Sequence, residues 1–231
     1  MIFGGLQKTT LVDYPGKVAA TVFTVGCNFR CPYCHNPELV LPELIQKQPQ
    51  ISEKEVIDFL TERRGLLEGL CITGGEPTLH PDLISFLEKV KSLGYLIKLD
   101  SNGSNPRVLE EIINKKLVDY LAMDVKTIPD KYYLVTLNQI PKEKILESID
   151  LIKNSGINYE FRTTVAPEIV TKEDIFQIVD LIKPAQAYFL QPFKNIKTLD
   201  PQFSQLHGIS EEELQEIINQ VKTFFKECGV R

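Results

Sequence analysis

Six short apolar runs divide the chain, and polar or glycine-rich clusters directly follow them. The first run, from Val18 to Val25, is rich in β-branched residues and stops at Gly26, which is typical of a strand buried on both faces. The other runs are equally short and apolar. The predicted strands are Val18–Val25, Leu70–Thr73, Leu96–Leu99, Tyr120–Val125, Tyr159–Val165 and Ala187–Leu190.

Longer segments with helical start and stop signals alternate with these strands. Three of them open with a capping box, a Ser or Thr followed three residues later by Glu or Asp. Residues 1–17 are expected to form a short strand pair or an arm, and residues 38–50 a connecting segment. The predicted helices run from Ser52 to about Arg64, Pro81 to Leu93, Pro106 to Lys116, Lys142 to Ser155, Thr171 to before Pro184, and Ser210 to Cys228.

Strands that alternate with helices of this length pair in parallel through right-handed crossovers. Six such units are fewer than the eight of a complete (β/α)8 barrel, which takes about 250 residues. The sequence therefore predicts an α/β fold, an open partial (β/α)6 barrel, with residues 1–231 as a single domain. Because ligands bind at the carboxyl ends of parallel strands, the polar clusters should surround one cavity.

Three cysteines crowd the loop after the first strand: Cys27, Cys31 and Cys34. Thiolates suit iron–sulfur clusters or zinc, and three ligands leave one position open for chemistry. His35 directly follows the last cysteine, so its side chain diverges too far to be the fourth ligand. The spacing favours a cluster with an open iron, with a zinc site and unligated cysteines as alternatives.

Composition narrows the class of protein. The chain has 231 residues, 43% of them hydrophobic, and a net charge of -5, which argues against a nucleic-acid binder with a basic face. The N-terminus has no secretion signal, and the apolar runs fall short of the roughly 20 residues that span a bilayer. Five cysteines, with three in one loop, make a poor disulfide framework. We therefore expect a soluble, cytoplasmic protein that binds neither membrane nor nucleic acid.

The cysteine loop resembles the signature of the radical S-adenosylmethionine (radical SAM) superfamily. The resemblance implies a 4Fe–4S cluster on Cys27, Cys31 and Cys34, with the amino and carboxylate groups of S-adenosylmethionine (SAM) on the fourth iron. The likeness is closer to the enzymes that activate glycyl radical enzymes. Val12–Lys17 and His35–Pro37 look most like the activating proteins of anaerobic ribonucleoside-triphosphate reductase.

Two strand-end clusters match SAM-binding motifs of this family. Gly74, Gly75 and Glu76 resemble the motif that holds the SAM amino group, with unobstructed backbone amides and a carboxylate; glycines after a strand also form plain tight turns. The second cluster corresponds to a strand end that contacts SAM, although its residues are all turn formers. Its predicted contacts are Asp100, Ser101 and Asn102.

Asp124 and Lys126 share a face of the fourth strand, since alternate residues do. On their own they could be a structural ion pair. The resemblance implies that they hold the methionine carboxylate and, in some activating enzymes, a monovalent cation, with Asp100 and Asp124 as its ligands.

Further contacts follow from the remaining strand ends and from the cysteine loop. Arg162 is a candidate carboxylate or ribose contact, or a merely solvated arginine, and Gln191 ends the sixth strand. Where related enzymes place a histidine, this chain has Lys194. Tyr33 and His35 correspond to the adenine contacts, although His35 could simply cap or pack the loop. The other two cysteines, Cys71 in a strand and Cys228 at a helix end, are interpreted as ordinary core and surface residues.

The resemblance implies an enzyme that reductively cleaves SAM to a 5′-deoxyadenosyl radical and places a radical on a glycine of a partner enzyme. The partner would be anaerobic ribonucleotide reductase, with a flavodoxin- or ferredoxin-like electron donor. Two alternatives remain open: a radical SAM enzyme for a small molecule, such as a 7-carboxy-7-deazaguanine synthase, and a non-enzymatic module that binds zinc or a cluster.

Overall fold

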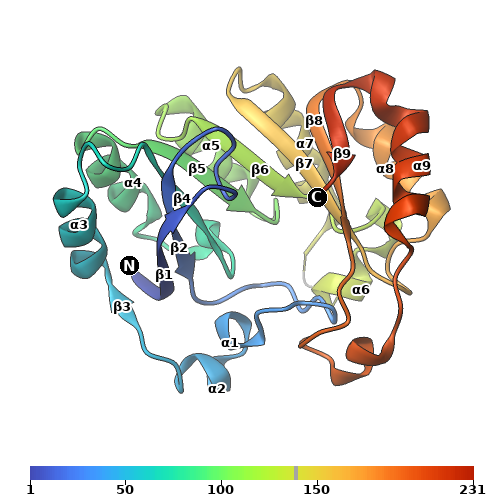
Figure 1. Ribbon diagram of the computed structural model, residues 1–231, viewed down its shortest axis with the longest axis horizontal. Coiled ribbons are helices and arrows are strands. Elements are labelled where there is room, and N and C mark those ends of the chain that lie inside the picture. The colour runs from blue at the N-terminus through green and yellow to red at the C-terminus, as the bar shows by residue number, and fades with distance from the viewer. Residues whose placement is uncertain (138–139) are drawn as a thin grey trace. The chain divides into compact units, whose positions relative to one another are not determined.

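The computed structural model describes residues 1–137 and 140–231 (Figure 1). Its backbone contacts group into two compact units, each built from three segments of the chain. The single domain expected above stays a prediction. The first unit contains residues 1–28, 38–101 and 107–121, and the second contains residues 29–37, 102–106 and 122–231.

The first unit has a sheet in the order β3-β1-β2-β4-β5. The strands β2, β4 and β5 are parallel, and β1 is antiparallel to β2. The lead-in predicted as a strand pair or an arm is thus one long strand, which pairs with β2 along most of its length and with the short β3 at Ile2 and Phe3. The bounds are β1 Ile2–Thr10, β2 Ala19–Thr24, β3 Ile51–Ser52, β4 Gly69–Gly74 and β5 Leu96–Ser101.

The second unit has a sheet in the order β6-β7-β8-β9, and its strands β7, β8 and β9 are parallel. Strand β6 begins in the first unit and ends in the second. All six predicted strands are therefore present, as β2 and β4 to β8. The bounds are β6 Tyr120–Asp124, β7 Asn158–Val165, β8 Ala185–Pro192 and β9 Phe225–Val230.

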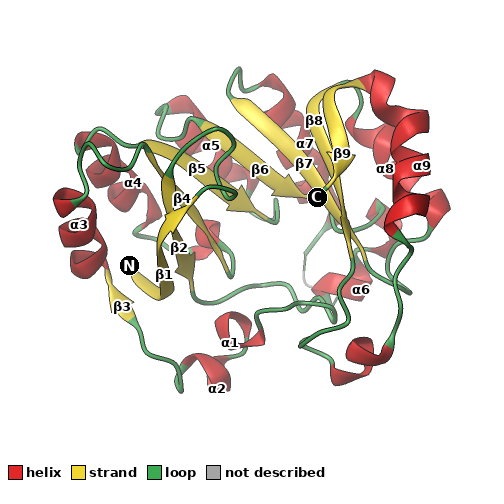
Figure 2. Cartoon of the chain, in the orientation of Figure 1, coloured by secondary structure: helices red, strands yellow, loops and turns green. Residues whose placement is uncertain are grey.

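Helices connect the strands, as the separate colours of helix and strand in Figure 2 make clear. Helices α3 and α4 pack together in the first unit, and α8 and α9 in the second. All three predicted capping boxes form, at the starts of α3, α8 and α9. The bounds are α1 Pro37–Val40, α2 Pro42–Ile45, α3 Glu53–Glu62, α4 Leu83–Ser92, α5 Pro106–Asn114, α6 Tyr133–Thr136, α7 Lys142–Asn154, α8 Lys172–Ile182 and α9 Glu211–Val221.

The last predicted helix is wrong beyond Val221. A short 3₁₀ turn at Lys222–Phe224 ends it, and residues 225–230 form β9. Phe225 packs on Tyr188, with ring centroids 5.3 Å apart, and the segment gains a parallel ladder with β8. Cys228 consequently lies in a strand and not at a helix end. Among the described residues, no helix is long and apolar enough to cross a membrane.

Candidate cofactor site

The cysteine loop starts where β2 ends, and several hydrogen bonds fix that start. Gly26 has a φ of 86°, a conformation that glycine adopts without strain, and its amide donates to Leu39 O over 2.7 Å. His80 Nε2 lies 2.9 Å from Val25 O, and because a carbonyl can only accept, this nitrogen carries the proton. Burial lowers the pKa of His80, which favours the neutral ring.

The three loop cysteines belong to different units. Cys27 lies in the first unit, and Cys31 and Cys34 lie in the second, where the amide of Cys34 donates to Cys31 O over 3.0 Å in a tight turn. None of the five cysteines, all of which lie in the described part of the chain, forms a disulfide. No group of three or more His, Cys, Asp or Glu side chains in the described parts of the chain is arranged around a metal position. The shared cluster thus stays a prediction that rests on the donor set and the motif.

The Gly74–Glu76 turn packs tightly on the start of the cysteine loop. The amides of Gly75 and Glu76 donate to Thr24 O and Gly26 O, each over 2.8 Å. A Cβ on Gly75 would lie 2.0 Å from Gly26 O, so only glycine fits there. Both amides are therefore already hydrogen-bonded within the unit. An ammonium group donates hydrogen bonds, so the backbone groups of this turn that could bind a SAM amino group are its carbonyl oxygens.

Glu76 is buried, at 1% exposure. Its Oε1 accepts hydrogen bonds from the Thr78 amide, the Thr78 hydroxyl at 2.6 Å and the Ser101 hydroxyl at 2.9 Å. Two predicted contacts, Glu76 and Ser101, are thereby brought together. These bonds tie the glycine turn to the end of β5.

Asp100 is held by a residue that the sequence analysis did not single out. The Lys98 ammonium, on the same face of β5, hydrogen-bonds to Asp100 Oδ1 and lies 3.8 Å from Cys71 Sγ. The sequence contains a pattern that could have predicted the pairing of Lys98 with Asp100. A lysine inside an apolar strand, two residues before a predicted ligand, shares that ligand's face.

Asn102 begins the segment that follows β5 and lies in the second unit. Its Oδ1 accepts the amide of Ser104 over 2.9 Å, as in an Asx turn. Gly103 has a φ of 75°, and a Cβ there would lie 2.1 Å from Met123 Cε. The plain-turn interpretation of this segment accounts for these contacts.

Asp124, Lys126 and Arg162 form one ionic cluster in the second unit. Asp124 Oδ2 lies 2.8 Å from Lys126 Nζ, and Asp124 Oδ1 lies 2.8 Å from Arg162 Nε. Burial raises the pKa of Asp124, but the two cations outweigh it and hold this pKa well below its ordinary value. The ion pair between Asp124 and Lys126, which the sequence analysis left as one alternative, is therefore present. Arg162 also binds Asp124.

A second acid–base pair extends this cluster along the sheet. Glu160 Oε1 lies 3.7 Å from Arg162 Nη1, and Glu160 Oε2 accepts from Arg231 Nη1 over 2.8 Å. The Arg231 guanidinium stacks 3.3 Å above the Phe189 ring. Arg231 was missed because its position depends on β9, which the sequence analysis predicted as helix.

Tyr33 is buried, and its hydroxyl has no hydrogen-bond partner within the described residues. Burial raises its pKa well above the ordinary value. A buried unpaired hydroxyl is costly. This atom can therefore pair with a polar group of a bound ligand.

His35 contacts the segment after β8. Its Nδ1 lies 2.9 Å from Lys197 O, and its ring stacks on Phe193 with centroids 6.2 Å apart. These contacts match the packing role left open above. Gln191 accepts from the Thr164 hydroxyl over 3.2 Å, so these two strand ends of the second unit are linked.

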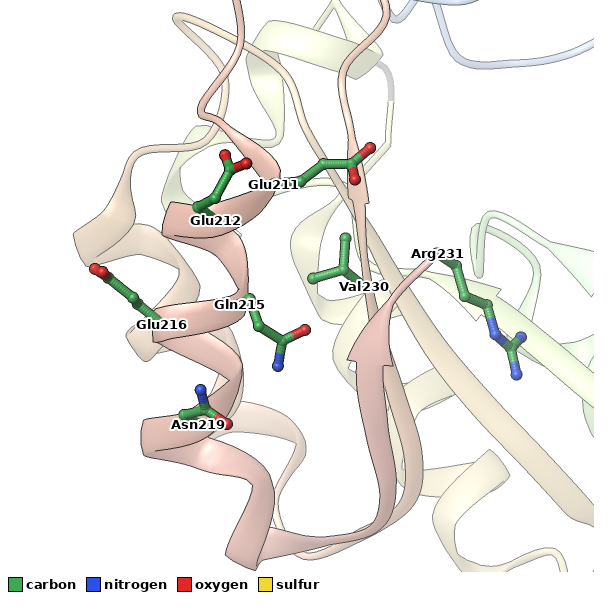
Figure 3. Close-up of a pocket in the computed structure, with 7 residues that line it drawn as sticks. All are labelled: Glu211, Glu212, Gln215, Glu216, Asn219, Val230 and Arg231. Atoms are coloured by element: carbon green, nitrogen blue, oxygen red, sulfur yellow. The ribbon is translucent and has the colours of Figure 1, made fainter.

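One hollow of about 540 Å³ lies between α9 and the end of β9. Figure 3 shows its acidic helix face, with Arg231 extending away from that helix. None of the predicted site residues lines it. The lining residues are Glu211, Glu212, Gln215, Glu216, Asn219, Val230 and Arg231.

Comparisons with known proteins agree with the motifs. The model of the radical SAM superfamily matches residues 21–182. A Methanocaldococcus jannaschii protein, provisionally named a glycyl-radical enzyme activating enzyme, is 35% identical over 238 residues, covering 100% of this chain and 95% of the relative. The pyruvate formate-lyase-activating enzyme of Clostridium pasteurianum is 30% identical over 189 residues, covering 77% of this chain and 74% of that enzyme.

Solved structures share the fold. Streptococcus suis SuiB bound to S-adenosylmethionine aligns with a TM-score of 0.69 at 12% identity, covering 90% of this chain and 48% of SuiB. A domain of a pyruvate-formate lyase-activating enzyme from Bacteroides vulgatus aligns with a TM-score of 0.55 at 20% identity, covering 71% of this chain and 98% of that domain. The α/β partial-barrel prediction is confirmed.

Proposed function

The chain belongs to the radical SAM superfamily and, within it, to the glycyl-radical enzyme activating enzymes, and from this premise we propose that its partner is an anaerobic ribonucleoside-triphosphate reductase. It is an enzyme, and its cofactors are a 4Fe–4S cluster and SAM. The observation that carries the choice of partner is the pair of segments Val12–Lys17 and His35–Pro37. A flavodoxin- or ferredoxin-like protein would supply the electron.

The donor chemistry of the three loop cysteines suits an iron–sulfur cluster. Cys27, Cys31 and Cys34 form no disulfide, and three soft thiolate ligands leave one iron open for SAM. The adjacent glycine turn and the bond from His80 hold the start of the loop. Rigid support of this kind keeps ligands in a productive position.

The residues also fit SAM. In the first unit, the carbonyl oxygens of the Gly74–Glu76 turn can accept hydrogen bonds from an ammonium group. Lys126 and Arg162, considered separately in the second unit, can pair with a carboxylate. The Tyr33 hydroxyl lacks a partner among the described residues and can pair with a polar group of the adenosyl part. His35 contacts Phe193 and Lys197, so its proposed role is to pack beside the adenine ring of SAM.

Cys27, Cys31 and Cys34 would hold the cluster, which when reduced would supply one electron for the cleavage of SAM and so the radical chemistry that removes a hydrogen atom from a glycine Cα. The side chains of this enzyme then have three tasks: to bind, to orient and to exclude water. None needs to act as an acid or a base. The low pKa of Asp124 keeps it charged, so Lys126 and Arg162 keep their positions.

The test begins with anaerobic reconstitution with iron and sulfide, reduction with dithionite, and an assay for 5′-deoxyadenosine from SAM. Anaerobic ribonucleotide reductase or pyruvate formate-lyase is then added, and the glycyl radical is measured by electron paramagnetic resonance. We expect the radical on the reductase. A radical on the lyase alone would show that the partner is wrong, and zinc binding without SAM cleavage would refute the function itself.

A further inference from the structure

A largely buried ion pair on β5 includes Asp100, the first of the predicted SAM contacts on that strand. Lys98 and Asp100 are two residues apart and share one face of the strand. The Lys98 ammonium donates to Asp100 Oδ1. The Lys98 side chain is 2% exposed and that of Asp100 is 14% exposed. The carboxylate thus has a cation of the protein itself within hydrogen-bonding distance.

This pair conflicts with the monovalent cation expected on Asp100. A sodium or potassium ion there would share the carboxylate with an ammonium of the same charge, and like charges repel strongly where little water screens them. The ammonium cannot move into solvent, because its side chain is buried, and separating it from the carboxylate would break a charge pair in a region that water screens poorly. Asp100 as found here does not fit a bound monovalent ion.

Asp124, the other expected cation ligand, also has positively charged partners. In the second unit, Asp124 gives one oxygen to Lys126 and the other to Arg162, each at 2.8 Å. A carboxylate with a cationic donor on each oxygen has little attraction left for a third cation. Both expected ligands, each considered in its own unit, are already neutralised by side chains.

We propose that Lys98 is the permanent counter-ion of Asp100 in the SAM site and takes the place of a monovalent cation. Lys98 acts through Asp100, so it is a positioning residue. The consequence is that SAM binds this enzyme equally well whichever monovalent ion is present. This inference rests on the proposed function, because it concerns the same SAM site.

The test measures the SAM dissociation constant of the cluster-loaded enzyme by equilibrium dialysis in potassium, sodium or tetramethylammonium chloride at equal ionic strength. Tetramethylammonium is too bulky to replace a bound metal ion. We expect values within about twofold in the three salts for the wild type, since uniform screening is unchanged. Radioactive rubidium, a potassium substitute, should show no saturable binding.

The variant Lys98→Met removes the ammonium and keeps an unbranched side chain of nearly the same length. Asp100 then loses the positive charge that Lys98 supplies, and an external cation can take that place. SAM binding should weaken about tenfold or more in tetramethylammonium and recover in potassium, and saturable rubidium binding should appear. The matched control is Lys91→Met, which removes the ammonium that Asp119 holds at 2.9 Å in the same unit and should leave SAM binding unaffected by the salt.

The wild-type measurement stands even if Lys98→Met does not fold. SAM binding by the wild type that is about tenfold tighter in potassium than in tetramethylammonium, or saturable rubidium binding, would overturn the inference and leave the proposed function standing. Absence of SAM binding in all three salts would instead refute the proposed function, and this inference with it.

Discussion

Three of the five cysteines are expected to bind the cluster. Cys27→Ala, Cys31→Ala and Cys34→Ala should each abolish cluster binding, because three thiolates are the minimum set for a cluster with one open iron. Cys71→Ala should retain it, since Cys71 is buried beside Lys98. Iron and sulfide content after anaerobic reconstitution, together with the visible absorption of the cluster, measures the effect. Equal loss in Cys71→Ala would mean that the ligands are misassigned.

Asp124 is expected to stabilise the folded enzyme through its two cations. Asp124→Asn should lower the free energy of unfolding at neutral pH by about 2 kcal/mol, less than for a fully buried pair, because the side chain is 24% exposed. Chemical denaturation of both proteins measures the difference. The matched control is Asp130→Asn, whose ion pair with Lys142 is at the surface and should contribute little.

The pH dependence of this contribution follows from the sign of the pKa shift. Burial raises the pKa of Asp124, but Arg162 and Lys126 outweigh burial and hold it below its ordinary value of 3.8. The stabilisation is therefore complete above that value and is lost only as the pH falls through the lower, folded-state pKa. The difference between wild type and Asp124→Asn should stay constant from neutral to mildly acidic pH. A difference that already shrinks near neutral pH would contradict the assignment.

The sequence proposes candidate site residues, but it does not predict all the partners that the structure gives them. Alternation along a strand predicted that Asp124 and Lys126 share a face. The bond from Arg162 to Asp124 joins β6 and β7, and strand register does not follow from a local pattern. Likewise, the sequence shows that Lys98 is an unusual charged residue within an apolar strand. Its contact with Cys71, however, depends on the pairing of β4 with β5.

The glycine turn after β4 is expected to tolerate no side chain. Gly75→Ala would place a Cβ 2.0 Å from Gly26 O, so the turn would have to move away from the cysteine loop. We expect SAM affinity to fall about tenfold or more, measured by equilibrium dialysis on cluster-loaded protein. Gly229→Ala is the control, since its nearest atom would be at 3.9 Å. Unchanged affinity in Gly75→Ala would show that the turn does not hold the ligand.

Local patterns predicted most elements, because capping boxes and apolar strands are local signals. The six strands and the three boxes that start α3, α8 and α9 are all present. Strand β9 was missed since its sequence continues the amphipathic character of α9, and pairing with β8 overrides that preference. Strand β1 was left undecided because its exposed edge has no clear alternation.

At the scale of the whole molecule, SAM should stabilise the enzyme only when the cluster is present. A ligand that binds only the folded state adds about 2.7 kcal/mol at a hundred times its dissociation constant. For a chain of 231 residues, this corresponds to a rise in the thermal midpoint of about 5 to 10 °C. Anaerobic melting followed by circular dichroism measures the midpoint with and without SAM.

The cluster-free protein and the variant Cys34→Ala provide the controls for this melting experiment. Neither has the open iron that is expected to chelate the amino and carboxylate groups of SAM, so their midpoints should move by much less. The side chains alone would then contribute only a minor part of the SAM affinity. An equal rise without the cluster would show that Lys126, Arg162 and the glycine turn suffice to bind SAM, and would contradict the chelation on which the proposed chemistry depends.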